Sequence, residues 1–106
     1  MPPLINMTTD TITKSKTRLD IKKPSLYRVI YVNDDFTSME FVIESLVTVF
    51  RLTTETAHEL TQKIHSEGSA VVAVLPYELA EQKGVEVTVM AKNNGYPLVV
   101  KLESDD

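Results

Sequence analysis

The sequence has no cysteine, no long apolar run and no excess of basic residues, and each absence removes a class of function. Without cysteine there is no disulfide framework, thiolate nucleophile or cysteine-ligated zinc. No run approaches the roughly 20 apolar residues that span a bilayer, and the first residues lack the apolar block of a secretory signal. The formal net charge of −4 argues against a duplex-binding surface, which depends on clustered Lys and Arg. We therefore expect a soluble, cytoplasmic protein that binds neither nucleic acid nor membrane.

The charge divides the 106 residues into two parts. Residues 1–24 carry five basic and two acidic side chains, a net +3, whereas the remaining residues carry six basic and 13 acidic ones, a net −7. The basic part is rich in Thr and Lys and has too few apolar residues to offset its ordering entropy. We expect residues 1–25 to form a flexible N-terminal extension and residues 26–106 to form one domain with one modest core.

The first half of this domain predicts a strand followed by two helices. Residues 26–32 are β-branched or aromatic, which is typical of a strand. A capping box follows, in which the Thr37 hydroxyl would accept from the amide of Glu40, and apolar residues at helical spacing continue to Phe50. A second helix is expected from near Thr53 until Gly68 ends it.

The second half predicts a strand, a helix and a strand. The continuous apolar run at 69–76 indicates a strand buried on both faces. A third helix with Pro76 in its first turn would end at 93–95, although the β-branched residues at 85–89 also suit a strand. Its expected inward face comprises Leu79, Ala80, Val87, Met90 and Ala91. Residues 96–103 form the last strand, at an edge or starting near Pro97. The predicted fold is α+β, a small three-stranded antiparallel sheet with three helices packed on it, in the order strand, helix, helix, strand, helix, strand.

Three adjacent polar side chains, Asn33, Asp34 and Asp35, follow the first strand directly, where two rigid elements can hold a binding loop. Such a group can hold a metal ion, a protonated amine or a Lys or Arg of the same chain. It lacks the alternating spacing and turn glycine of a calcium loop. The two histidines, His58 and His65, lie about 10 Å apart along one helix, too far for a single zinc ion.

The same acidic group also suits an ordinary solvated turn, since acids near a helix N-terminus gain a few tenths of a kcal/mol. No nucleophile motif, oxyanion-hole signature or phosphate loop accompanies it. The residues therefore favour a binding module over an enzyme, with no catalytic residue, metal or cofactor.

Four segments together resemble the ClpS family, the adaptors of the bacterial N-degron pathway. They are YRVIYVNDDFTSMEFVIESLVTVF at 27–50, IHSEGSAVVAV at 64–74, PYELAEQK at 76–83 and YPLVVKLE at 96–103. The motif Asn-Asp-Asp-aromatic-Thr-x-Met-Glu-Phe in the first segment is specific rather than generic. The resemblance covers about 80 residues, from Leu26 to Glu103, and leaves out the basic extension.

The resemblance implies a monomeric adaptor that binds proteins beginning with Leu, Phe, Tyr or Trp. It would deliver them to the N-terminal domain of a ClpA- or ClpC-type AAA+ unfoldase, which feeds the ClpP protease. The cation is then the α-ammonium group of the substrate, held by Asn33, Asp35 and His65 with support from Asp34. The pocket for the first side chain would be formed by Val32, Thr37, Met39, Val42, Thr61, Ile64 and Leu98.

The resemblance places the unfoldase contact on the third helix, at Tyr77, Glu78 and Lys83, although these residues also suit an ordinary solvated helix face. At Thr61 the sequence departs from the family, which usually has Met in that pocket wall. Two alternatives to an N-degron adaptor stay open. One is a relative that docks on the unfoldase and chiefly inhibits or redirects it, and the other is a small acid/base hydrolase.

Overall fold

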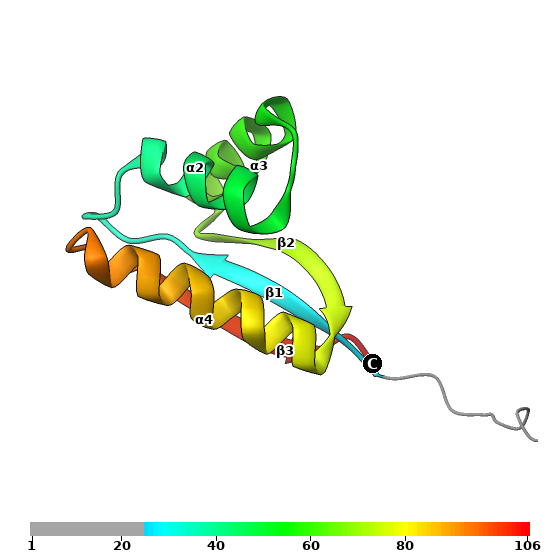
Figure 1. The fold of residues 1–106 in the computed structure, drawn as a ribbon. Coiled ribbons are helices and arrows are strands. Elements are labelled where there is room, and N and C mark those ends of the chain that lie inside the picture. Colours follow the sequence, from blue (N-terminus) through cyan, green and yellow to red (C-terminus); the bar gives the residue numbers. More distant parts are fainter. Residues whose placement is uncertain (1–24) are drawn as a thin grey trace, which may run out of the picture.

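The computed structural model describes residues 25–106, in which helices and strands follow one another in the predicted order (Figure 1). The elements are β1 Leu26–Val32, α2 Met39–Phe50, α3 Thr54–Glu67, β2 Ser69–Pro76, α4 Tyr77–Asn93 and β3 Val99–Ser104. Apart from Ser25, the predicted N-terminal extension lies outside the described residues.

The three strands form one antiparallel sheet in the order β2-β1-β3, so that the first strand is central. Val29 pairs with Ala73 on β2 and with Leu102 on β3. The register between β1 and β2 then shifts, because Val72 is an extra residue that forms a β-bulge. In the helical layer α4 contacts all three strands, α3 contacts β2, and α2 packs against both other helices. This arrangement confirms the predicted α+β fold.

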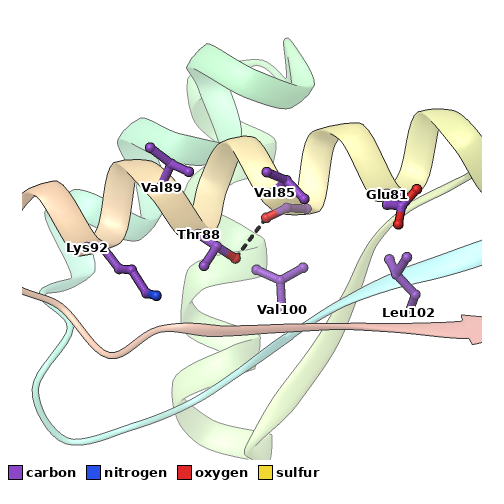
Figure 2. Close-up of a pocket in the computed structure, with 8 residues that line it drawn as sticks. Glu81, Val85, Thr88, Val89, Lys92, Val100 and Leu102 are labelled. Atoms are coloured by element: carbon purple, nitrogen blue, oxygen red, sulfur yellow. Dashed lines mark hydrogen bonds between the residues drawn. The ribbon is translucent and has the colours of Figure 1, made fainter.

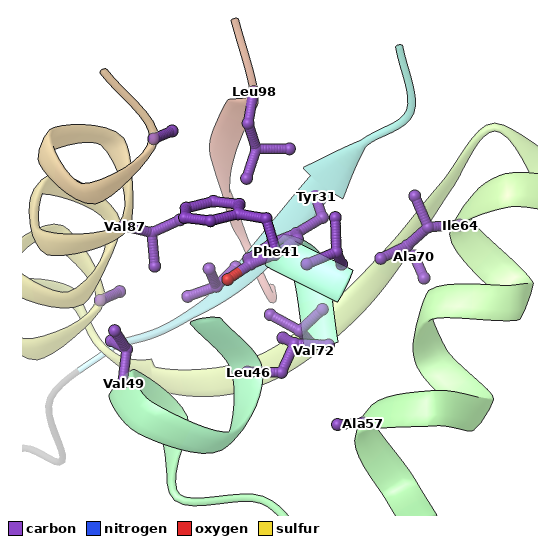
Figure 3. Packing of buried hydrophobic residues seen from close by; sticks show 14 residues of the cluster. Tyr31, Phe41, Leu46, Val49, Ala57, Ile64, Ala70, Val72, Val87 and Leu98 are labelled. Carbon is purple, nitrogen blue, oxygen red and sulfur yellow. The ribbon is translucent and has the colours of Figure 1, made fainter. Parts of the chain in front are cut away.

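The core lies between β1 and the helices. Val29 and Tyr31 have no exposed surface, as the alternation of side chains along a strand predicts. Leu46 and Val49 from α2 and Val87 from α4 cover them (Figure 3). Burial of each large apolar side chain contributes roughly 1.5–3 kcal/mol, so this contact decides how the helical layer sits on the sheet.

A chain of hydrogen bonds joins the centre of the sheet to α2. Ser45 Oγ donates its single hydrogen to the carbonyl of Val42, 2.9 Å away. The Tyr31 hydroxyl is therefore the donor in its 2.7 Å contact with Ser45 Oγ. Burial raises the pKa of the Tyr31 hydroxyl above its ordinary value, against the opposing effect of the bond to Ser45. The hydroxyl thus stays protonated and keeps its donor role.

The predicted capping residue of the first helix is wrong by one position. Ser38 is the N-cap of α2, and its side-chain oxygen accepts from the amide of Phe41 at 3.1 Å. Thr37 takes no part in this cap, because its amide and its hydroxyl both donate to the carboxylate of Asp34. The Asp34 carboxylate therefore engages Thr37, and a cap by Ser38 takes the place of the predicted capping box.

Both edge strands differ from their predictions. β2 is not buried on both faces, since Val71 and Val74 are 40% and 43% exposed. The physical reason is that the helices cover only one face of the sheet, so the other face of this edge strand is exposed to solvent although the strand is rich in apolar residues. β3 lies at an edge of the sheet, as predicted, but it begins at Val99 rather than at Tyr96, because Tyr96 packs on Phe41 instead, with ring centroids 5.1 Å apart.

The ambiguous residues 85–89 are helical, within the 17 residues of α4. Ala80, Val87 and Ala91 are buried against the core, and this packing outweighs the weak helix propensity of the segment. Leu79, predicted to face inward, is 39% exposed. The expected inward face is therefore confirmed at Ala80, Val87 and Ala91 and wrong at Leu79.

The Tyr31–Ser45 contact predicts an unequal effect of removing either partner. Ser45→Ala should lower the free energy of unfolding by about 1–3 kcal/mol, because it leaves a buried donor unpaired. Tyr31→Phe should cost less, about 0.5–1.5 kcal/mol, because Ser45 keeps its bond to Val42. Urea unfolding of both single variants and the double variant measures this. Strictly additive losses in the double variant would show that the contact carries no coupling.

Candidate functional site

The loop between β1 and α2 is built around one carboxylate. Asp34 Oδ1 accepts from the amides of Phe36 and Thr37 at 2.8 and 2.7 Å, and Oδ2 accepts from the Thr37 hydroxyl at 2.8 Å. Burial alone would raise the pKa of Asp34, but these hydrogen bonds outweigh it and hold the pKa below its ordinary value. Asp34 is therefore charged at neutral pH and fixes the course of the loop.

The loop is also joined to the end of α3. The amide of Asn33 donates to the carbonyl of Gly68 at 2.9 Å. Gly68 is the C-cap of α3 and has a left-handed conformation with φ of 93°, which favours glycine. This link brings the last turns of α3, which carry Ile64 and His65, against the polar loop.

A hollow of about 200 Å³ lies between this loop and α3. Its lining combines polar and apolar side chains, namely Asn33, Asp34, Asp35, Thr37, Met39, Val42, Thr61, Ile64 and His65. A smaller hollow of about 10 Å³ shares part of this lining and adds Val32 from the end of β1 and Leu98 from before β3. Every residue predicted for amine binding or for the side-chain pocket thus lines one of these two hollows. What each residue does there stays a prediction.

The two ends of the lining differ in chemistry. The carboxylate oxygens of Asp34 already accept hydrogen bonds from the loop. The side chains of Asn33, Asp35 and His65, in contrast, make no hydrogen bond within residues 25–106. A carboxylate, an amide oxygen and a neutral imidazole nitrogen are acceptors, which suits a cationic donor. Val42, Ile64 and Leu98 are buried and apolar, which suits a hydrophobic group.

Among residues 25–106, no three His, Asp or Glu side chains come close enough together to hold a metal ion. None of the helices in this part is long and apolar enough to cross a membrane.

The residues predicted for the unfoldase contact lie at the start of α4, and none of them lines either hollow. Tyr77 is 45% exposed and packs edge-on against Tyr27, with ring centroids 5.0 Å apart. Glu78 is exposed. Lys83 Nζ donates to the carbonyl of Val49 at 3.0 Å, so that it also caps the C-terminal end of α2.

A further hollow, of about 260 Å³, was not anticipated from the sequence. It lies between α4 and β3 and is lined mainly by Val85, Val89, Val100 and Leu102 (Figure 2). Thr88 also lines this hollow, and its hydroxyl donates to the carbonyl of Gly84 at 2.8 Å. Glu81 and Lys92 are the charged residues of this lining, which therefore lacks the cluster of acceptors that residues 33–35 bring to the first hollow.

Comparison with known proteins identifies the family of this chain. The family model described as ATP-dependent Clp protease adaptor protein ClpS matches residues 22–101. A ClpS protein of Acetivibrio thermocellus is 40% identical over 99 residues, which are 93% of this chain and all of that relative. The ClpS protein of Escherichia coli is 42% identical over 94 residues, 89% of each chain.

A solved structure extends the likeness from sequence to fold. Agrobacterium tumefaciens ClpS2 bound to L-phenylalaninamide has a TM-score of 0.76 and 40% identity, and the match covers 78% of this chain and all of that one. The family model spans the loop at 33–35, the last turns of α3 and the chain up to the first half of β3, so it includes the whole lining of the site. By sequence and by fold, this chain belongs to the ClpS family, the adaptors of the ATP-dependent Clp protease.

Proposed function

We propose that this adaptor recognises proteins by a free N-terminal amine together with a large first side chain, Leu, Phe, Tyr or Trp. The observation that carries the proposal is the juxtaposition, in one hollow, of unoccupied acceptors and a buried apolar wall. An N-terminal residue is the part of a protein that joins an ammonium group to a side chain at a single carbon atom.

Asn33, Asp35 and His65 bind the ammonium group in this proposal. An α-ammonium has three N–H donors, and these side chains supply acceptors of three kinds. Asp34 keeps the loop in place and adds negative potential, since its own oxygens already accept from Phe36 and Thr37. Hydrogen bonds to a charged group contribute roughly 1.5–3 kcal/mol each.

The first side chain enters between α2 and α3, against Met39, Val42 and Ile64. Burying Leu or Phe contributes about 1.5–3 kcal/mol. Together with the amine bonds, and less the cost of association, this suits micromolar to submicromolar binding that can release its cargo. L-Phenylalaninamide, the ligand of the ClpS2 relative, has a free amine, a phenylalanine side chain and an amide in place of the carboxylate, as an N-terminal Phe does.

Delivery requires a second surface, which we place at Tyr77, Glu78 and Lys83. These residues lie apart from the hollow, so a monomer can hold a substrate and contact the N-terminal domain of a ClpA- or ClpC-type unfoldase at the same time. Nothing in this division of labour requires a catalytic group on the adaptor, and the unfoldase and its protease carry out the degradation.

The ammonium assignment predicts a strong dependence on the free amine. Acetylating a Phe-initiated peptide should weaken its binding by at least about 2 kcal/mol, roughly 30-fold, because acetylation removes the charge and donors. Asp35→Ala should produce a comparable loss for the free peptide. Fluorescence anisotropy measures both. Glu44→Ala, which removes an exposed carboxylate of α2 outside the hollow, is the matched control and should bind normally. Equal affinity for acetylated and free peptides would rule out the site.

The docking assignment predicts that peptide binding and unfoldase binding can be separated. Glu78→Lys should weaken binding to the isolated N-terminal domain of a ClpA-type unfoldase at least about fivefold, since a reversed charge turns attraction into repulsion. Its affinity for peptides should not change. Glu86→Lys makes the same change at another exposed position of α4 and serves as control. If both variants lose affinity equally, the effect comes from net charge and not from this contact.

The substitution of Thr for the usual Met at position 61 predicts a selectivity change. Thr is too short to contact a small Leu side chain across the hollow, whereas an aromatic ring reaches further. Thr61→Met should therefore improve the binding of a Leu-initiated peptide relative to a Phe-initiated one by about 0.5–1.5 kcal/mol. Titration of the two peptides against both proteins measures the ratio, and an unchanged ratio would contradict the expectation.

A further inference from the structure

Thr61 has a buried hydroxyl without a partner. The residue is 3% exposed, and within residues 25–106 its Oγ1 is buried and makes no hydrogen bond. Arg28 Nε is the other buried atom of this kind in that part of the chain, but it lies 3.9 Å from the carboxylate of Asp105. Buried polar atoms nearly always have a partner, so the Thr61 hydroxyl calls for an explanation.

The surroundings of Thr61 point to a ligand as the missing partner. Thr61 lines the hollow in which the proposed function places the first side chain of a substrate. The other hydroxyl of that lining, on Thr37, already donates to Asp34. A threonine on a helix has two accessible χ1 rotamers, so its hydroxyl can turn toward a ligand group without a shift of the helix.

The position of Thr61 along α3 indicates how far that ligand group lies from the amine. Thr61 precedes His65 by four residues, which is about 6 Å along the helix axis. Because His65 belongs to the amine end of the lining, a group that meets Thr61 lies about this far from the amine. The phenolic oxygen of a tyrosine side chain lies at about that reach.

We propose that Thr61 is a specificity-determining residue that selects an N-terminal tyrosine through a hydrogen bond between the two hydroxyl groups. Leu and Phe have no polar group to offer. The indole N–H of Trp lies closer to its backbone than the phenolic oxygen does, and it can only donate. A tyrosine hydroxyl both donates and accepts, so it can pair with the Thr61 hydroxyl in either direction.

This inference rests on the proposed function, and its consequence is a preference between two nearly isosteric residues. Peptides that differ only in beginning with Tyr or Phe should bind with affinities about fivefold apart, in favour of Tyr. In Thr61→Val, which keeps the shape and removes the hydroxyl, the Tyr-to-Phe ratio should fall to one or below, because the phenol is then buried unpaired. In Thr61→Ser, which keeps the hydroxyl, Tyr should still be favoured.

The experiment is a fluorescence anisotropy titration of the two peptides against the unaltered full chain and the two variants. A Tyr-to-Phe ratio that is the same in the unaltered chain and in Thr61→Val would overturn the inference, and so would loss of the preference in Thr61→Ser. If neither peptide binds the unaltered chain, or if acetylation has no effect, the proposed function itself fails. If the peptides bind and depend on the free amine but the Tyr-to-Phe ratio differs from the expectation, only this inference fails and the proposed function still holds.

Thermal unfolding of Thr61→Val adds a readout that is independent of ligands. Replacing an unpaired buried hydroxyl by a methyl group of the same shape should leave the midpoint of unfolding unchanged or raise it. A midpoint lowered by several degrees would mean that the hydroxyl has a partner within the folded protein. That result would overturn the inference.

Discussion

Burial of Tyr31 against α2, which includes the hydrogen bond from its hydroxyl to Ser45, holds α2 against the central strand of the sheet, and the loop between β1 and α2 depends on this packing. Tyr31 lies on the central strand, so its position is set by neighbours on both sides. Because α2 packs on it, the loop that joins β1 to α2 is held at both ends. The positions of Asn33 and Asp35 follow from an interaction made deep inside the core.

The two adjacent carboxylates of the loop differ in their contacts. Asp34 accepts three hydrogen bonds from its own loop, whereas Asp35 is exposed beside the hollow. Because the Asp34 carboxylate already accepts hydrogen bonds from the loop, the proposed amine site relies on Asp35 as a second carboxylate. The bond from Asn33 to Gly68 then brings α3 and His65 to the same place. One side of the site is local in sequence and the other arrives from 30 residues away.

Local patterns in the sequence determined the elements and much of the site. The limits of β1, the cap at Gly68 and the helical spacing up to Phe50 follow from periodicity and residue chemistry, which act between neighbours. The same local chemistry marked residues 33–35 as a polar loop that suits either a cation or an ordinary solvated turn. Resemblance to a family then added distant members of the lining, such as Leu98, which no local pattern indicates.

Only the tertiary structure decided which groups are already engaged and which remain free. The Thr37 hydroxyl donates to Asp34, and Ser38 caps the helix instead. Sequence spacing alone does not show which of two neighbouring hydroxyl groups will form the cap. Burial of α4 against the sheet decided that residues 85–89 are helical, which propensity left open. The helices cover one face of the sheet, so Val71 on the apolar strand β2 is exposed. The hydroxyl of Thr61 is ordinary in the sequence and becomes informative only when its neighbours are known, because an unpaired polar atom is defined by what surrounds it.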